Sequence, residues 1–224
     1  MNYFSQEYLD FFTEFKNNNS KDWFDANRKR YEKSIKVPFK EFVELIIARV
    51  QADDPDFLTT PKESIFRINR DIRFSKDKTP YKTSMSALLI PGGKKNKGLP
   101  GIHFSFGAEK LVFHGGVFMP EKGYLEAIRR AIVEDPKALR KLIADKDFIR
   151  HFGELQGEPN KRIPTEFQET YKIEPLIAYK QFYFMTELPA AELLTQNLAD
   201  TIIEHYLAGK PLLRFLQNAA VPVA

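Results

Sequence analysis

The spacing of the apolar residues changes twice along this chain of 224 residues. Helical spacing dominates the first 55 residues and the chain beyond Pro120. The segment between them consists of short runs rich in Ile, Phe, Leu and Val, separated by Gly, Pro and Lys, as is typical of an antiparallel meander. The sequence therefore predicts an α+β fold, in which a central antiparallel sheet packs against helices from the N- and C-terminal segments.

Capping residues and breaks mark the expected helices. One helix is predicted after Ser5, a second after Ser20 or Asp22, and a third from Pro38 until residues 53–55. In the C-terminal half, Asp135-Pro136 separates two helices. A long helix is predicted over residues 190–207 and ends at Gly209, and Pro211 opens a short final helix.

The expected strands lie mainly in the middle of the chain. A Gly-Ala-Glu-Lys segment after Phe106 suits a hairpin turn, and a turn centred on Ala108 and Glu109 makes His103 face His114. The predicted strands are residues 64–74, 85–91, 101–106 and 111–119, and a further strand is possible near 181–185. We predict a single domain over residues 1–224, with N-terminal helices in 1–55, the sheet meander in 62–120 and a mostly helical part in 121–224.

The composition bears on the compartment and on membrane association. The chain has no cysteine, which excludes disulfides and thiolate metal sites and favours a reducing cytoplasm. No stretch of about eighteen residues is free of charge, so no membrane span is expected. The first twenty residues carry three acidic side chains and do not resemble a secretory signal. We therefore expect a cytoplasmic protein without a membrane partner.

The positive charge of the chain is concentrated in one segment. Residues 67–82 read RINRDIRFSKDKTPYK and hold six Lys or Arg against two Asp. Residues 67–97 carry nine Lys or Arg against the same two Asp, a net +7 within a chain of net +4, so the rest sums to −3. This segregation favours a local anionic partner. Alternatively, the loop lysines Lys94, Lys95 and Lys97 serve only solubility.

The basic stretch has two interpretations. On a strand, Arg70 shares a face with Phe66, Ile68, Ile72 and Phe74, so its guanidinium needs a carboxylate, backbone carbonyls or a ligand. A structural ion pair between sheet and helix satisfies this need as well as a ligand does. The adjoining loop mixes ammonium groups, hydroxyls and an aromatic ring, a combination that can hold phosphate or carboxylate, but it lacks the glycines of a P-loop. The candidate ligand-binding residues are Arg67, Arg70, Arg73, Lys76, Lys78, Tyr81 and Lys82.

The stretch from Phe66 to Thr83, FRINRDIRFSKDKTPYKT, resembles the signature block of a bacterial and fungal family known as domain of unknown function 2461. The resemblance extends from Trp23-Phe24 through Gly115-Gly116 to the C-terminal helices and so covers most of the chain. It implies a single domain. The family has no established activity, and the resemblance therefore implies no catalytic residue and no cofactor.

Two central histidines are candidates for proton transfer. In the predicted register, the Cβ atoms of His103 and His114 lie roughly 5 Å apart, close enough to act as catalytic acid and base. Two ligands are too few for a metal site, so no metal is predicted. Polar residues on a solvated sheet face explain the pair equally well.

Three functions remain open on the sequence. The first is an enzyme or ligand-binding domain that recognises a small phosphate- or carboxylate-bearing molecule through the basic cluster. The second is a nucleic-acid-binding module that uses the same cations on phosphates and its aromatic residues on bases. The third is an interaction protein whose arginines are paired internally and serve the architecture. The sequence indicates no particular cofactor and no oligomeric state.

Overall fold

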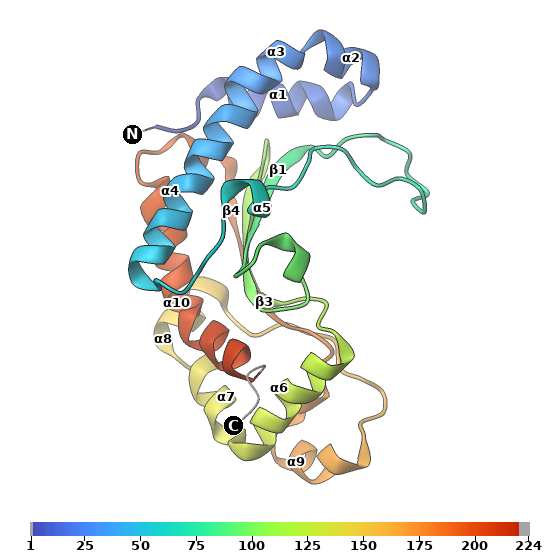
Figure 1. Cartoon of the computed structure of the whole chain (residues 1–224), viewed down its shortest axis with the longest axis vertical. Coiled ribbons are helices and arrows are strands. Elements are labelled where there is room, and N and C mark those ends of the chain that lie inside the picture. Colours follow the sequence, from blue (N-terminus) through green and yellow to red (C-terminus); the bar gives the residue numbers. More distant parts are fainter. Residues whose placement is uncertain (1, 220–224) are drawn as a thin grey trace. The chain divides into compact units, whose positions relative to one another are not determined.

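The computed structural model describes residues 2–219, and its sheet has four strands in the order β1-β2-β3-β4 (Figure 1). Neighbours in the sheet are also neighbours in sequence order, so the sheet is an antiparallel meander. The strands are β1 (Ser84–Leu89), β2 (Gly101–Gly107), β3 (Lys110–Val117) and β4 (Phe182–Pro189). The predicted α+β class is confirmed, and the possible strand near 181–185 is the start of β4.

The described residues group into two compact units. The first unit contains residues 2–94, 103–113 and 187–203, and the second contains residues 95–102, 114–186 and 204–219. The basic stretch of residues 67–82 lies entirely within the first unit.

Four helices open the first unit, and the predicted second helix is divided between two of them. The Ser20 hydroxyl accepts a hydrogen bond from the backbone N–H of Trp23 and caps α2 as predicted. A π-helical turn at Glu32–Lys36 joins α3 to α4 without a break, so Pro38 lies in the first turn of α4. The helices are α1 (Gln6–Asn17), α2 (Lys21–Ala26), α3 (Arg28–Tyr31) and α4 (Val37–Asp53).

The core of the first unit is aromatic. The rings of Phe39 and Phe42 on α4 pack against those of Phe104 and Phe106 on β2, with ring centroids 5.4 to 6.1 Å apart. All four side chains are fully buried. Tyr8 on α1 is also buried, and its hydroxyl donates a hydrogen bond of 3.0 Å to the carbonyl of Phe106. The alternate residues of β2, including His103 and Ser105, are half-buried, so only one face of this strand belongs to the core.

The second unit is built around Phe184 of β4. Its ring packs against Phe148 and Phe152, with centroids 5.3 and 4.5 Å apart. A Cβ atom added at Gly115 or Gly209 would overlap the same ring. The helices that contribute to this unit are α6 (Lys122–Glu134), α7 (Pro136–Ile143), α8 (Lys146–Phe152), α9 (Gln168–Ile173) and α10 (Leu198–Asn218), the last of which begins in the first unit.

The prediction of a regular strand over residues 64–74 is wrong. The short helix α5 (Pro61–Ser64) occupies its start, and only the isolated bridges Ile65↔Ala87 and Asn69↔Tyr81 follow. The shared apolar face inferred for this strand is also absent, because Phe74 is 94% exposed. Without a continuous ladder of bridges, alternation along the segment no longer determines which side chains are buried.

The prediction for the C-terminal helices is also wrong. Residues Ala190–Leu194 form a 3₁₀ turn, and α10 then runs without a break through Gly209 and Pro211. Gly209 lies inside the helix and does not end it. Its missing side chain leaves room for the ring of Phe184. Proline inside a helix removes one backbone hydrogen bond, a cost that packing of the rest of α10 offsets here. Leu212, Leu213 and Leu216, which follow Pro211, are buried.

We predict that Gly115→Ala lowers the free energy of unfolding by about 1–3 kcal/mol, because the added methyl group overlaps the enclosed ring of Phe184. Gly123→Ala in α6 is the matched control, since a Cβ atom there meets nothing within 4 Å. The control should be neutral or stabilising by about 0.5–1 kcal/mol. Urea denaturation followed by circular dichroism measures both, and equal effects would contradict the proposed packing.

Candidate anion-binding site

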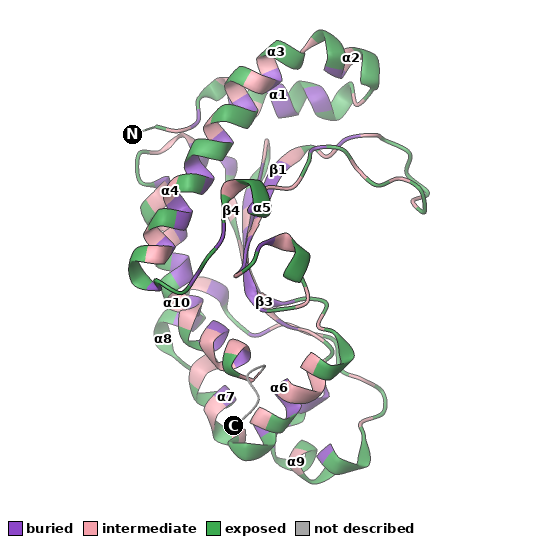
Figure 2. Cartoon of the chain, viewed as in Figure 1, coloured by how far each residue is buried: buried purple, intermediate pink, exposed green. Residues whose placement is uncertain are grey.

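Residues 66–82, here called the arm, leave the sheet and return to it between α5 and β1 (Figure 1). The backbone N–H of Lys82 donates to the carbonyl of Ile68 at 2.8 Å, and that of Arg70 donates to the carbonyl of Pro80 at 2.9 Å. At the base, the N–H of Phe66 donates to the carbonyl of Ser86 in β1 at 2.9 Å. The arm is therefore an irregular hairpin that continues from the edge of the sheet, and most residues of its tip, 71–79, are exposed (Figure 2).

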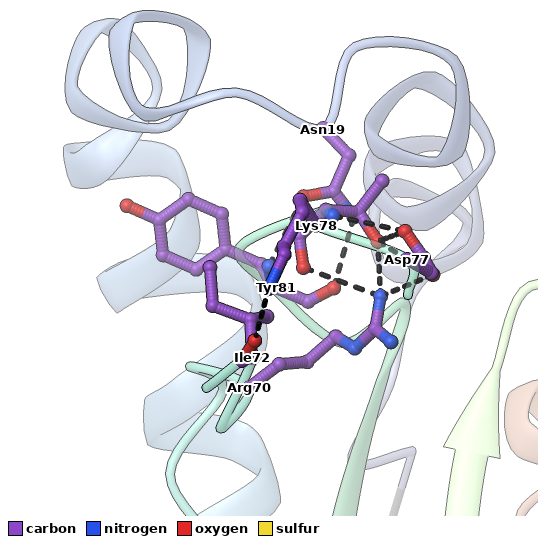
Figure 3. A network of polar contacts seen from close by, with 7 residues as sticks. Asn19, Arg70, Ile72, Asp77, Lys78 and Tyr81 are labelled. Atoms are coloured by element: carbon purple, nitrogen blue, oxygen red, sulfur yellow. Dashed lines mark hydrogen bonds and ion pairs between the residues drawn. The ribbon is translucent and has the colours of Figure 1, made fainter. Parts of the chain in front are cut away.

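Asn19 and Tyr81 anchor the arm to the N-terminal helices. The amide of Asn19 donates to the carbonyl of Tyr81 at 2.9 Å and accepts from its N–H at 3.1 Å, so it replaces a strand partner (Figure 3). The ring of Tyr81 is buried and stacks on Phe24, with centroids 4.5 Å apart. Tyr81 was predicted as a ligand-binding residue, and the structure places its ring in the aromatic cluster that holds the arm.

Arg70 and Lys78 cross-link the arm tip. One guanidinium nitrogen of Arg70 donates to the Asp77 carboxylate and to the carbonyl and hydroxyl oxygens of Thr79 (Figure 3). The Lys78 ammonium donates to the carbonyl of Ile72 at 2.9 Å. Hydrogen bonds from Thr79 and Arg70, led by the backbone N–H of Thr79, lower the pKa of Asp77 to about 2. The tip is thus closed by side chains from its own sequence.

Arg73 also has a partner within the arm. Its guanidinium donates two hydrogen bonds, of 2.9 and 2.7 Å, to the carboxylate of Asp71, and these bonds lower the pKa of Asp71 below its ordinary value. The predicted alternative of internally paired arginines is therefore observed for Arg70 and Arg73. These pairs are local and partly or largely exposed, with 26% of the Arg70 side chain and 76% of the Arg73 side chain accessible. They do not tie the sheet to a helix, and exposed pairs of this kind contribute at most about 1 kcal/mol.

Arg67 and Lys82 differ from these paired arginines. Within residues 2–219, neither side chain has a hydrogen bond or an ion-pair partner. The Lys82 ammonium lies over the ring of Phe66, 5.0 Å from its centroid. Partial burial first, and then the positive charge of Arg67, lower the pKa of Lys82. Two cations that repel each other therefore lie together at the base of the arm.

Other side chains on the half-buried face of the sheet lie beside this pair of cations. The ring of Phe66 also contacts the imidazole of His103 on β2, with centroids 6.1 Å apart. Farther along the same strands, the hydroxyls of Ser105 and Ser84 are hydrogen-bonded at 3.0 Å. The ring of Phe66 thus lies between the Lys82 ammonium and the imidazole of His103, and the charge of the exposed Arg67 reaches Lys82, an arrangement that can bind an anion.

His114 lies on β3 and is half-buried. The two-residue connection Ala108-Glu109 between β2 and β3 confirms the predicted hairpin turn. That His103 and His114 act together stays a prediction. Among the residues that the structure describes, no group of three or more His, Cys, Asp or Glu is arranged to hold a metal ion.

A small pocket opens next to the two serines. Its volume is about 190 Å³, and the cations at its edge, Lys16 and Lys110, are each bound to a glutamate. The lining residues are Phe12, Lys16, Thr83, Ser84, Ser105, Gly107, Ala108, Glu109, Lys110 and Val112.

Sequence reasoning missed Phe66, Ser84 and Ser105 as site residues, because no motif joins them and only strand pairing brings them together.

A comparison with protein families gives a match whose residues include the arm. A family described as conserved hypothetical protein, DUF2461, matches residues 7–215. The chain belongs to the DUF2461 family. No curated protein matches the sequence of this DUF2461 chain.

No helix in the described part of the chain is long and apolar enough to cross a membrane.

We predict that Asn19→Ala loosens the arm, because it removes both hydrogen bonds to the backbone of Tyr81. The expected cost is about 1–3 kcal/mol of stability, with faster amide hydrogen exchange in residues 66–82. Asn17→Ala is the control, since the Asn17 amide makes only one exposed bond of 3.4 Å within α1. Exchange in the arm that is as slow in Asn19→Ala as in Asn17→Ala would contradict the anchoring role.

Proposed function

We propose that this DUF2461 chain binds a small phosphate- or carboxylate-bearing molecule at the base of the arm, through Arg67 and Lys82. The observation that supports the proposal is the contrast among the cations of one stretch. Arg70 and Arg73 are bound to carboxylates, whereas Arg67 and Lys82 are close together and neither forms an ion pair with a residue from 2 to 219. An anion placed between two unneutralised cations relieves their repulsion and gains charge-assisted hydrogen bonds.

Each residue near the pair has a role in this proposal. Arg67 supplies a planar guanidinium that can bind two oxygens at once, and Lys82 supplies a compact ammonium. The ring of Phe66 lies under the ammonium of Lys82 and helps to position it. His103, in contact with the same ring, is the candidate acid or base. Proton transfer at this site makes an enzyme the favoured class, and the absence of cysteine supports a cytoplasmic location for it.

Arg67→Ala and Lys82→Met test the proposal directly. Lys82→Met keeps an apolar stem against Phe66 and removes only the charge. Each should weaken binding of inorganic phosphate or a phosphomonoester by about tenfold or more, since a hydrogen bond to a charged group contributes about 1.5–3 kcal/mol. Thermal shift and isothermal titration calorimetry measure the affinity.

Lys40→Ala is the matched control for these variants. It removes one positive charge from the exposed surface of α4, outside the arm, and should leave phosphate affinity within about twofold, because solvent and salt screen exposed charges. Equal losses in all three variants would indicate nonspecific charge attraction. No stabilisation of the wild type by phosphates or carboxylates would overturn the proposal.

Anion binding should also raise the pKa of Lys82. In the free protein, partial burial and the charge of Arg67 hold this pKa below its ordinary value, and a bound anion favours the charged ammonium. Binding is therefore accompanied by proton uptake, and it weakens as the pH rises through the pKa of Lys82 in the free protein. Carbon-13 NMR of the lysine Cε atoms, assigned with Lys82→Arg, measures the change. A pKa that stays constant at saturating phosphate would contradict direct contact.

A further inference from the structure

Phe74 is the most exposed of the large apolar side chains at the surface, with 94% of its area accessible. It lies at the arm tip, between residues whose side chains bind the backbone and one another. The bond from Lys78 to the carbonyl of Ile72 and the bonds from Arg70 to Asp77 and Thr79 cross-link the tip around it. Single exposed apolar residues are common, but this one is displayed by a tip that is already ordered. A preorganised aromatic side chain loses little entropy when a partner covers it.

The surroundings of Phe74 are basic. The guanidinium carbon of Arg73 lies 5.8 Å from the centre of its ring. Lys76 is exposed and has no hydrogen bond or ion pair with any residue from 2 to 219. The two acidic residues of the tip, Asp71 and Asp77, are each bound to an arginine. The tip therefore presents a flat ring beside the guanidinium of Arg73, with the exposed Lys76 two residues further along the chain, and its carboxylates are bound to arginines.

From this arrangement we infer that the arm tip binds single-stranded nucleic acid, with Phe74 stacked on a base and Arg73, Lys76 and Lys78 facing phosphates. A ring flanked by cations is the recognition chemistry of sequence-tolerant single-strand binding. Stacking needs a base that is free of its own duplex stack, which favours a single strand. The inference concerns a second surface, distinct from the Arg67–Lys82 pair, and extends beyond the proposed function.

An acidic protein and an anionic membrane are the other classes of partner for such a tip. Residues 71–79 hold Arg73, Lys76 and Lys78 against Asp71 and Asp77, and both carboxylates are bound to arginines, so the charge that the tip offers a partner is positive and favours a polyanion over a protein pocket. The Phe74→Leu variant distinguishes nucleic acid from a membrane, because stacking requires a ring, whereas insertion among acyl chains requires only apolar volume.

Fluorescence anisotropy with a labelled twelve-nucleotide oligothymidine tests the inference on the full chain. We expect Phe74→Leu to bind about five- to 150-fold more weakly than wild type, because stacking on one base is lost, and Phe74→Trp to bind at least as tightly as wild type. An abasic oligomer of the same length should bind wild type and Phe74→Leu equally. Lys76→Ala should lower the slope of log affinity against log salt by about 0.7.

The outcomes distinguish nucleic acid from a membrane as the partner of the tip, and they distinguish the tip from the Arg67–Lys82 pair. Because Phe74 is almost fully exposed, its variants should unfold at the wild-type temperature, so lost binding does not reflect lost folding. Equal affinity of wild type for the normal and abasic oligomers, or no binding at all, would overturn the inference. Binding to phosphatidylserine vesicles that survives Phe74→Leu, without oligonucleotide binding, would assign the tip to membranes instead. Phosphate binding that is lost in Arg67→Ala and kept in Phe74→Leu would leave the proposed function standing in either case.

Discussion

The position of the arm depends on the contacts that hold Tyr81 against the N-terminal helices. Its backbone forms two hydrogen bonds with the side chain of Asn19, and its ring is buried against Phe24. Lys82 is the next residue, so this anchor also determines where its ammonium lies. With the anchor in place, the Lys82 ammonium lies over the ring of Phe66, and its charge stays near Arg67. Without the anchor, two repelling cations on an irregular hairpin would separate, and the candidate site would not persist.

The charges of the arm fall into two groups with different consequences. Arg70 and Arg73 use the only two carboxylates of the segment, Asp77 and Asp71, and thereby order the tip. These carboxylates are bound to Arg70 and Arg73, and Arg67 and Lys82 form no ion pair with residues 2–219, although the charge of Arg67 also acts on Asp71. Internal pairing and anion binding are competing interpretations of one basic stretch. The structure shows internal pairing for Arg70 and Arg73, and we propose anion binding for Arg67 and Lys82. The proposed binding site consists of Arg67 and Lys82, the two cations that are not paired in this way.

Much of the fold was accessible from sequence because its signals are local. The helix cap at Ser20, the break at Asp135-Pro136 and the two-residue hairpin turn each depend on a few adjacent residues. The errors occurred where distant contacts override local preference. Gly209 suggested a helix end, yet it lies inside α10. A glycine is needed there because the ring of Phe184 occupies the space of a side chain. Likewise, a strand was predicted over residues 64–74 from its apolar content, but only two isolated bridges form there.

The sequence by itself determined the α+β class, the meander, the concentration of charge in one segment and the family signature, because composition and short-range periodicity carry this information. Only the tertiary structure decided which cations are neutralised and which side of the sheet they share. It brought Phe66 to His103 and Ser84 to Ser105 through strand pairing, and it placed Phe74 in solvent. The physical reason is that hydrogen-bond partners and burial depend on contacts between residues far apart in the chain, which spacing along one segment does not encode.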